Sequence, residues 1–345
     1  MDFVYANENH STIINEKNGV VFLTFPKLVK AGVCHGFSTR IGGVSEGYLS
    51  SMNLSFTRGD DPQKVQENFQ RIGEAIGFNA DARYAIGIDI TKNHISGVLI
   101  NLYGEIIYSV RLRYRFEESD VYYKEIQKLI FHVMEKGQVG ATSILGVGVS
   151  IPSIIAEDGK SLTYSPIIGA MNIYEDLKKY IDFPYKIIND SNSGGYAELW
   201  HAKKIKNMIY LSLSNSIGGA VLMNNEIYYG DRMHSGEFGH MTLEINGRQC
   251  YCGKKGCVDA YCNAQNLSNL TDGDLGKFFE LVEAGDERCV KELQQYMLYL
   301  AVTINNLYNI LDCDVILGGY VGGYMEKYLD ELRRMVSERC TFATD

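Results

Sequence analysis

The chain has 345 residues, of which 46% are hydrophobic and 22% are charged, and this composition is typical of a globular protein with room for about two or three domains. Its formal net charge is −9, which argues against nucleic-acid binding by the chain itself, because such binding needs a basic surface. No apolar run reaches the roughly 18 residues of a transmembrane helix, and the N-terminal stretch lacks the basic start and apolar run of a signal peptide. We therefore expect a cytoplasmic protein that does not enter a membrane.

Residues 1–82 form the first predicted segment and contain the string HGFSTRIGGVSEGYLSSMNLSFTRGDD. This string resembles the N-terminal part of the laccase-domain family, whose members include purine nucleoside phosphorylases once called polyphenol oxidases. The resemblance covers about residues 20–79 and implies a partial α+β domain. We expect Arg40, Gly42 and Asn53 to keep a local fold, although half a domain cannot bury its usual core. The strings of that family's metal and catalytic centre, such as H-A-G-W-R-G, do not occur in this sequence, so we expect neither phosphorylase nor oxidase activity.

Two repeats of one pattern of strands and helices follow from about residue 84. In the first, the β-branched runs AIGIDI, ISGVLINL and EIIYSVRL predict three strands, the apolar spacing over 120–136 predicts a helix, and SILGVGVSI predicts a further buried strand. In the second, MIYLSLS, GGAVLMN and EIYYG predict three strands, residues 275–311 a helical region, and DVILGGY a last strand. The repetition indicates internal duplication. It predicts two α/β lobes with a ligand cleft between them, which we place at residues 83–184 and 185–345.

One imidazole and three thiols lie close together in the string GEFGHMTLEINGRQCYCGKKGC, namely His240, Cys250, Cys252 and Cys257. Zinc takes four nitrogen and sulfur ligands in a closed tetrahedral site when its role is structural, and the glycines between the last two cysteines allow the tight turns that wrapping an ion needs. A disulfide would leave one thiol over, and thiolate ligands fit a reducing compartment. We therefore predict a structural zinc site with these four ligands. A catalytic zinc site and four unconnected residues are the alternatives.

The same string carries a family resemblance. GEFGH followed by CYCGKKGCVD is similar to the signature of the ROK family, whose name joins repressors, open reading frames and sugar kinases. The resemblance covers about residues 84–345 and implies two ribonuclease-H-like lobes of the actin and sugar-kinase type, zinc on the four residues above, and self-association. It also implies that Glu237, His240 and Asp259 face a bound sugar, although the family usually has Glu at the last position. ROK proteins normally continue through another strand and helix, so we expect the chain to be truncated at Asp345.

A second motif, NDSNSGGYAE, begins at Asn189 and follows an apolar strand-like run. It is similar to the ROK string N-D-A-N-A-A-A-x-A-E, which implies that Asn189 and Asp190 bind the sugar. In a kinase of this family the Asp190 carboxylate would accept a proton from a sugar hydroxyl as phosphate arrives. The alternative is that Asp190 and Ser191 only cap the next helix. The family's Asn in S-P-N is replaced by Ile167, so the sugar is left open between a pentose and a hexose.

The phosphate-binding motifs are altered. Kinases of the ROK family have D-x-G-G-T in the first hairpin, where small residues let backbone N–H groups approach phosphate oxygens, but this chain has Thr91 and Lys92 in place of the glycines. The second phosphate loop, usually G-T-G-I-G-G-G, reads SNSIGGA. The positions that correspond to the family's nucleotide site are Asp89, Asn93, Ser216, Gly218, Gly219, Gly318 and Gly319.

The favoured function is a ROK-type regulatory protein that binds a sugar or sugar phosphate as an effector, without catalysis. Repressors of the family carry a winged helix-turn-helix, yet residues 1–80 contain 7 Lys and Arg against 8 Asp and Glu, which is not a basic DNA-binding surface. DNA would be reached only through another module. The first alternative is an ATP-dependent hexose kinase, with ATP and Mg²⁺ as cofactors and Asp190 as base. A phosphorylase or oxidase and a non-functional fusion are the remaining alternatives.

Overall fold

The computed structural model describes residues 11–31, 33, 35–77, 80–170, 172–201 and 205–342. The chain forms two compact units. The first ends at Tyr84 and also takes in Asn101–Glu105, and the second comprises Ala85–Ile100 and the chain from Ile106 onward. Asn79, near which we expect the laccase-like resemblance to end, lies outside the described residues.

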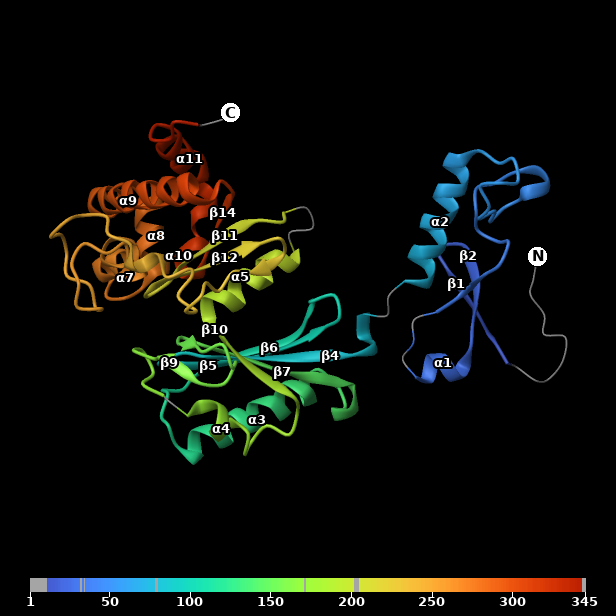
Figure 1. Cartoon of the computed structure of the whole chain (residues 1–345), viewed down its shortest axis with the longest axis horizontal. Coiled ribbons are helices and arrows are strands. Elements are labelled where there is room, and N and C mark those ends of the chain that lie inside the picture. The colour runs from blue at the N-terminus through green and yellow to red at the C-terminus, as the bar shows by residue number, and fades with distance from the viewer. Residues whose placement is uncertain are drawn as a thin grey trace. The chain divides into compact units, whose positions relative to one another are not determined.

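The first unit packs one long helix, α2, on a small antiparallel sheet of β1, β2 and β3 (Figure 1). The helix begins after Asp61, whose carboxylate accepts a hydrogen bond from the Gln63 N–H at 2.8 Å. Pro62 occupies the first helical position, where an N–H would have no helical acceptor. The elements of this unit are β1 (Ile13–Lys17), β2 (Val20–Thr24), α1 (Pro26–Lys30), β3 (Phe37–Ser38), the 3-10 turn η1 (Gly47–Leu49), α2 (Pro62–Ile76) and the 3-10 turn η2 (Ala80–Ala82).

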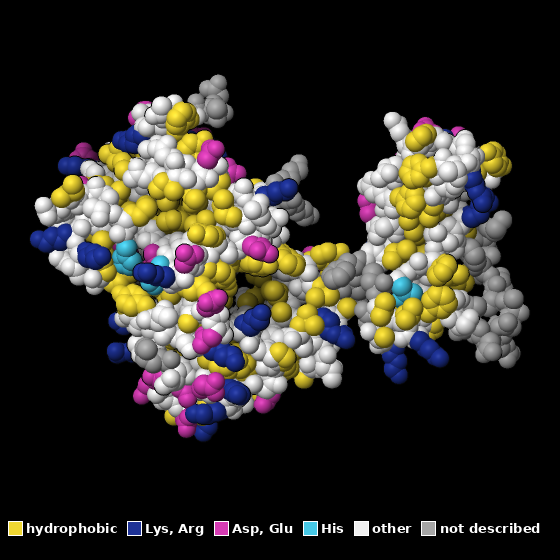
Figure 2. Space-filling model, viewed as in Figure 1, with side chains coloured by type: hydrophobic (Ala, Val, Ile, Leu, Met, Phe, Trp, Pro, Cys, Tyr) yellow, Lys and Arg dark blue, Asp and Glu magenta, His cyan; other side chains and the backbone are white. Residues whose placement is uncertain are grey.

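The hydrophobic core of the first unit is small. Many hydrophobic side chains remain on its surface (Figure 2), and the exposed fraction reaches 64% for Phe37 and 79% for Tyr48. A core of this size gives a segment of this length only modest stability. The buried residues of this core cluster are Val20, Phe22, Met52, Ile72 and Ala75.

Polar contacts hold the loop that leads to α2. The buried Asn68 amide nitrogen donates to the Ser45 hydroxyl at 2.8 Å and to the Asn53 carbonyl at 2.9 Å. Gly42 has a φ of +93°, and a Cβ at this position would lie 2.3 Å from the Gly19 carbonyl oxygen, so only glycine fits. Asn53 and Gly42 thus take part in a local fold, as the sequence predicts.

The second unit contains a five-stranded mixed sheet in the order β10-β7-β4-β5-β6 (Figure 1). Strands β5 and β6 are antiparallel, and β10 runs parallel to β7. One face packs on α3, since a Cβ at Gly97 would lie 3.0 Å from the side chains of Leu129 and Val133. Because β10 belongs to this sheet, the sheet extends past residue 184, where we place the lobe boundary from sequence. The elements are β4 (Tyr84–Ile90), β5 (His94–Asn101), β6 (Ile106–Arg113), α3 (Asp120–Lys136), η3 (Ala141–Ser143), β7 (Ile144–Ile151), β8 (Ile154–Ile155), β9 (Leu162–Tyr164), α4 (Ile173–Leu177) and β10 (Tyr185–Asn189).

A four-stranded mixed sheet follows, in the order β13-β12-β11-β14. Its residues alternate between two faces, as the period of a strand requires. Tyr210 and Leu222 are buried on the face covered by α5, and Ile209 and Leu211 join a large hydrophobic core on the face covered by α8 and α9 (Figure 1). The elements are α5 (Asp190–His201), β11 (Met208–Leu213), β12 (Ile217–Met223), β13 (Glu226–Ile227), η4 (Phe238–His240), α6 (Asp259–Cys262), α7 (Ala264–Ser268), η5 (Asn269–Thr271), α8 (Leu275–Glu283), α9 (Glu287–Leu311), β14 (Asp314–Gly318), α10 (Gly319–Gly322), η6 (Met325–Tyr328) and α11 (Leu329–Ser337).

The element order repeats, as the sequence predicts. Three strands, a helix and a strand appear as β4, β5, β6, α3 and β7, and three strands, helices and a strand appear again as β11, β12, β13, α8, α9 and β14. Among the described residues, no helix has both the length and the apolar character that crossing a bilayer requires.

Candidate functional site

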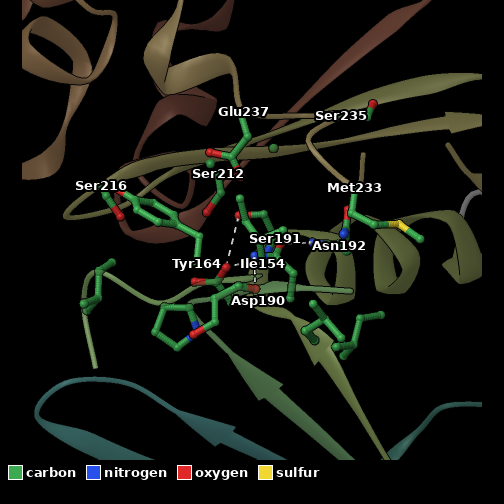
Figure 3. A pocket seen from close by; sticks show the side chains of 18 of the residues that line it. Ile154, Tyr164, Asp190, Ser191, Asn192, Ser212, Ser216, Met233, Ser235 and Glu237 are labelled. Atoms are coloured by element: carbon green, nitrogen blue, oxygen red, sulfur yellow. Dashed lines mark hydrogen bonds between the residues drawn. The ribbon is translucent and has the colours of Figure 1, made fainter. Parts of the chain in front are cut away.

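A cavity of about 290 Å³ lies in the second unit. Its walls come from the segment after β7, the start of α5, the β11–β12 turn and the residues before η4. Figure 3 shows the side chains of Asp190, Tyr164 and Glu237 around one space. The volume is close to the lower end of about 300 Å³ found for small-molecule sites. Polar groups from distant parts of the chain therefore meet at a space that suits a small ligand.

Asp190 is the first residue of α5 and directly follows β10. Its Oδ1 atom accepts a hydrogen bond from the Ser191 N–H at 2.8 Å. The residue is exposed and lines the cavity. Burial raises the pKa of Asp190 to about 6, repulsion from Asp89 adds to the rise, and the Ser191 hydrogen bonds oppose it. A carboxylate with this pKa can accept a hydrogen bond or a proton from a ligand hydroxyl near neutral pH.

Asn189, and not Asp190, supplies the cap of α5. The Asn189 Oδ1 atom accepts from the Asn192 N–H at 3.1 Å, and its amide nitrogen donates to the Ser153 carbonyl at 3.2 Å. This is the usual hydrogen bond of a helix cap to the third helical residue. Both ends of the Asn189 amide are thus engaged, although the residue lines the cavity. The capping alternative for Asp190 is therefore not needed to explain the motif.

Glu237 lines the cavity just before η4, and burial raises its pKa while the nearby His240 opposes the rise. His240 is not among the residues that line the cavity, and the Tyr251 hydroxyl lies 3.3 Å from its Nε2 atom. Asp259 also lies outside the cavity wall: it is buried, and its Oδ2 atom accepts from the Ile217 N–H at 2.6 Å. Asp259 thus holds the β11–β12 turn, and that His240 and Asp259 face a bound sugar stays a prediction from the family resemblance.

The four predicted metal ligands, in contrast, come together. The ligand atoms of His240, Cys250, Cys252 and Cys257 all lie within 4.8 Å of one another. The Nδ1 atom of His240 is buried and has no hydrogen-bond partner among the described residues. A buried polar atom of this kind needs a partner, and a metal ion would supply one. The residues present therefore fit a tetrahedral site with one nitrogen and three sulfur ligands.

The predicted phosphate loop is a closed turn between β4 and β5. The Thr91 N–H donates to the His94 carbonyl at 2.9 Å, and the His94 N–H donates to the Thr91 hydroxyl at 3.1 Å. A phosphate can use backbone N–H groups only where they point to it unpaired. These two are engaged within the turn, and neither Asp89 nor Asn93 lines the cavity.

The glycines of the second phosphate loop have packing roles. A Cβ at Gly218 would lie 2.0 Å from the Ser191 hydroxyl oxygen, and a Cβ at Gly219 would lie 2.3 Å from the Phe238 ring. Both glycines and Ser216 line the cavity. The close approach of β12 to α5 and η4 thus explains these glycines without a nucleotide.

Gly318 and Gly319 lie outside the cavity wall, where β14 meets α10. A Cβ at Gly318 would lie 2.3 Å from the Tyr210 hydroxyl, and Gly319 has a φ of +76°, which favours glycine. The next residue, Tyr320, accepts a hydrogen bond from Arg111 of β6 at 3.0 Å, and the guanidinium lies 5.6 Å from the centroid of its ring. The protein's own side chains therefore connect β6 to α10 on this side.

Sequence reasoning missed the aromatic part of the cavity. Tyr164, Tyr229 and Tyr251 all line it. For Tyr251 a signal was present, because it stands between two predicted metal ligands, Cys250 and Cys252. The other two tyrosines lie in segments without a motif, so only the tertiary fold brings them to the site.

The sequence profile of the ROK family matches residues 85–343. The chain belongs to the ROK family. A profile described as multi-copper polyphenol oxidoreductase laccase matches residues 34–99, so this match continues beyond Asn79 and overlaps the ROK match over residues 85–99.

Relatives of the ROK chain include regulators and enzymes. The xylose repressor of Bacillus subtilis (strain 168) is 32% identical over 279 residues, which cover 76% of this chain and 71% of that protein. The N-acetylmannosamine kinase of Vibrio cholerae serotype O1 (strain ATCC 39315 / El Tor Inaba N16961) is 23% identical over 234 residues, or 65% of this chain and 82% of that protein.

Solved structures of both kinds share the fold. A ROK family transcriptional regulator, a homolog of the E. coli MLC protein, superposes with a TM-score of 0.65 at 17% identity over 80% of this chain and 76% of that one. A ROK family glucokinase from Streptomyces griseus in complex with glucose and AMPPNP gives a TM-score of 0.63 at 19% identity, over 76% of this chain and 92% of that one. These likenesses establish a sugar-kinase type α/β fold for the second unit.

Proposed function

We propose that this chain is a sugar-responsive regulator that binds a sugar in the cavity and does not phosphorylate it. One observation carries the proposal. The sugar-side residues Asn189, Asp190 and Glu237 line one cavity, whereas Asp89 and Asn93 of the first phosphate loop do not. Ser216, Gly218 and Gly219 of the second phosphate loop also line it, but the close packing against Ser191 and Phe238 accounts for the two glycines. A kinase needs both sides, because phosphoryl transfer is mostly positioning and charge stabilisation around the phosphates.

A pentose, with D-xylose as the first candidate, is the proposed ligand. The relatives at 30% and 32% identity are named xylose repressors. Ile167 stands where ROK proteins often have a sugar-contacting Asn and lines the cavity, so one polar contact is replaced by an apolar one. A pentose lacks the exocyclic CH₂OH group of a hexose, and a smaller, less polar site suits it.

We further propose that the cluster of His240, Cys250, Cys252 and Cys257 holds a structural zinc ion. Such an ion, when bound, stabilises the local fold directly. The support is the buried, unpartnered Nδ1 atom of His240 beside three thiols. One of the four cluster residues, His240, is the last residue of η4. The cluster therefore helps to hold η4, and with it Glu237, at the cavity wall.

As a regulator, the protein would respond to sugar by a shift of population between conformations of the cavity walls. DNA contact is assigned to no described part of the chain. In the first unit, strand β3 lies between helices α1 and α2, whereas a helix-turn-helix joins two helices by a short turn. Self-association remains a prediction from the family.

A thermal-shift screen of zinc-loaded protein tests the function. The ligands are D-xylose, D-glucose, N-acetylmannosamine and sugar phosphates, each with and without MgATP. We expect D-xylose to raise the melting temperature and MgATP to add nothing, because a ligand that binds only the folded state stabilises it by mass action. Additional stabilisation by MgATP would favour the kinase alternative instead, and no shift with any sugar would contradict sugar sensing.

A further inference from the structure

Tyr251 connects the metal cluster to the cavity. It stands between the predicted ligands Cys250 and Cys252, yet 54% of its side chain is exposed and it lines the cavity. Its hydroxyl oxygen lies 3.3 Å from the Nε2 atom of His240. The two rings meet edge to face, with centroids 5.5 Å apart. Tyr251 therefore contacts His240 and also lines the space that a ligand would occupy.

The two ring nitrogens of His240 have different surroundings. The Nε2 atom faces the Tyr251 hydroxyl, with the Glu237 Oε2 atom 3.8 Å away. The Nδ1 atom is buried and unpartnered, and the thiols are its neighbours in the cluster. A metal bound through Nδ1 requires that lone pair, so the neutral ring must carry its proton on Nε2. The Nε2–H group then donates its hydrogen bond toward Tyr251.

This tautomer also sets the role of the Tyr251 hydroxyl. A phenol is both donor and acceptor. Once its oxygen accepts from His240 Nε2–H, its own proton is available for a second group, and the cavity is the side on which a ligand oxygen can take it. Hydrogen bonds in such a chain polarise one another.

We propose that Tyr251 is a positioning and specificity residue that presents the metal cluster to the bound sugar, by donating its hydroxyl proton to a sugar oxygen while it accepts from His240. This inference rests on the proposed sugar-binding function. It adds a second polar group beside the direct contact between His240 and the sugar that the family resemblance implies, because Tyr251 lines the cavity.

Tyr251→Phe tests the role of the hydroxyl in zinc-loaded, full-length protein. The ring and its packing remain, so metal content and melting temperature should not change. We expect the affinity for D-xylose, measured by isothermal titration calorimetry, to fall about tenfold, the effect of one lost hydrogen bond. The matched control is Tyr228→Phe, since Tyr228 is 56% exposed and is not part of the cavity wall. Unchanged affinity in Tyr251→Phe beside a wild type that binds would overturn the inference.

Replacing zinc by Co²⁺ adds a readout that simple packing would not move. Because Tyr251 links the ligand to a metal-bound imidazole, D-xylose should shift the visible absorption of the Co²⁺-loaded wild type. The shift should be much smaller in Tyr251→Phe and unchanged in Tyr228→Phe. An equal shift in all three proteins would contradict the proposed hydrogen-bond chain from the sugar through Tyr251 to His240. A wild type that binds D-xylose in neither experiment would instead refute the proposed function, on which the inference rests.

Discussion

On the sugar side of the second unit, polar side chains reach a cavity, whereas on the nucleotide side the β4–β5 turn and α10 bond to the protein itself and only the β11–β12 loop reaches the cavity. Asp190 and Glu237 line the cavity. The Thr91 N–H is engaged within the β4–β5 turn, and Arg111 donates to Tyr320. The two sides therefore differ in what is free to meet a ligand, although both keep parts of the ROK pattern.

The glycines show that a sequence motif for nucleotide binding can be kept in a protein that does not bind a nucleotide. Gly218 and Gly318 are each required by a neighbouring side chain, since a Cβ would lie 2.0 Å from Ser191 and 2.3 Å from Tyr210. Packing alone would keep these glycines in a protein that binds no nucleotide. A polar side chain that faces a cavity is stronger evidence of a ligand than a glycine that the core demands.

The largest effect is expected at the metal cluster on the sugar side. Cys257→Ser removes a ligand whose side chain is only 1% exposed, so we expect loss of zinc and a fall of about 4 kcal/mol or more in the free energy of unfolding. Thermal melting and metal analysis measure both. The control is Cys340→Ser, which lies outside the cluster. Unchanged melting with zinc still bound would remove the structural role.

Asp190→Asn should abolish most sugar binding without unfolding the protein. The variant keeps the shape but loses the charged acceptor, and hydrogen bonds to charged groups contribute about 1.5–3 kcal/mol, so we expect a loss of about 100-fold in affinity for D-xylose. Titration calorimetry measures it, with Asp182→Asn as the exposed control. If affinity survives in Asp190→Asn, the sugar side is not where we place it.

Sugar affinity should depend on pH through the same carboxyl. Burial raises the pKa of Asp190 from 3.8 to about 6, so its contribution to stability is greatest below about pH 4 and is lost as the pH rises through 6. Sugar binding should follow the opposite trend, because the ligand needs the ionised acceptor. We expect affinity to fall about tenfold per pH unit below 6, and Asp190→Asn to lack this fall. A flat wild-type profile between pH 5 and 7 would contradict the assignment.

The smallest effect is expected on the nucleotide side. Arg111→Gln removes one exposed hydrogen bond and one cation–π contact, so we expect a loss of less than about 1 kcal/mol in stability and no change in sugar affinity. Arg113→Gln, on the same strand, is the matched control. A tenfold loss of sugar affinity in Arg111→Gln alone would show that the nucleotide side and the sugar side are coupled, contrary to this expectation.

Much of the fold is predictable from sequence because its elements are locally specified. The apolar spacing over 120–136 coincides with α3, and the alternating runs became β4, β5, β11 and β12. The predicted helical region 275–311 is divided into α8 and α9, because Gly285 has a φ of +81° and Asp286 caps the second helix. Two residues determine this break, whereas the helical spacing of apolar residues continues on both sides of it. A prediction from that spacing therefore does not detect the break.

The candidate site is only partly predictable. The metal cluster follows from ligand spacing, since its four residues lie close in the chain. The surroundings of His240 and Asp259 do not, because they depend on the tertiary fold: the Tyr251 hydroxyl lies beside His240, and the Ile217 N–H donates to Asp259. Tyr164 and Tyr229 reach the cavity only through the packing of separate elements.

The central claim is that a sugar is bound and no phosphoryl group is transferred. The most direct test incubates zinc-loaded protein with D-xylose and MgATP and follows the mixture by ³¹P NMR, with D-glucose and N-acetylmannosamine in parallel and sugar binding checked by calorimetry. We predict that the sugar binds and that the ATP signals persist without any sugar-phosphate signal. Sugar phosphate formed over many turnovers, and lost in Asp190→Asn, would contradict the account and establish a kinase.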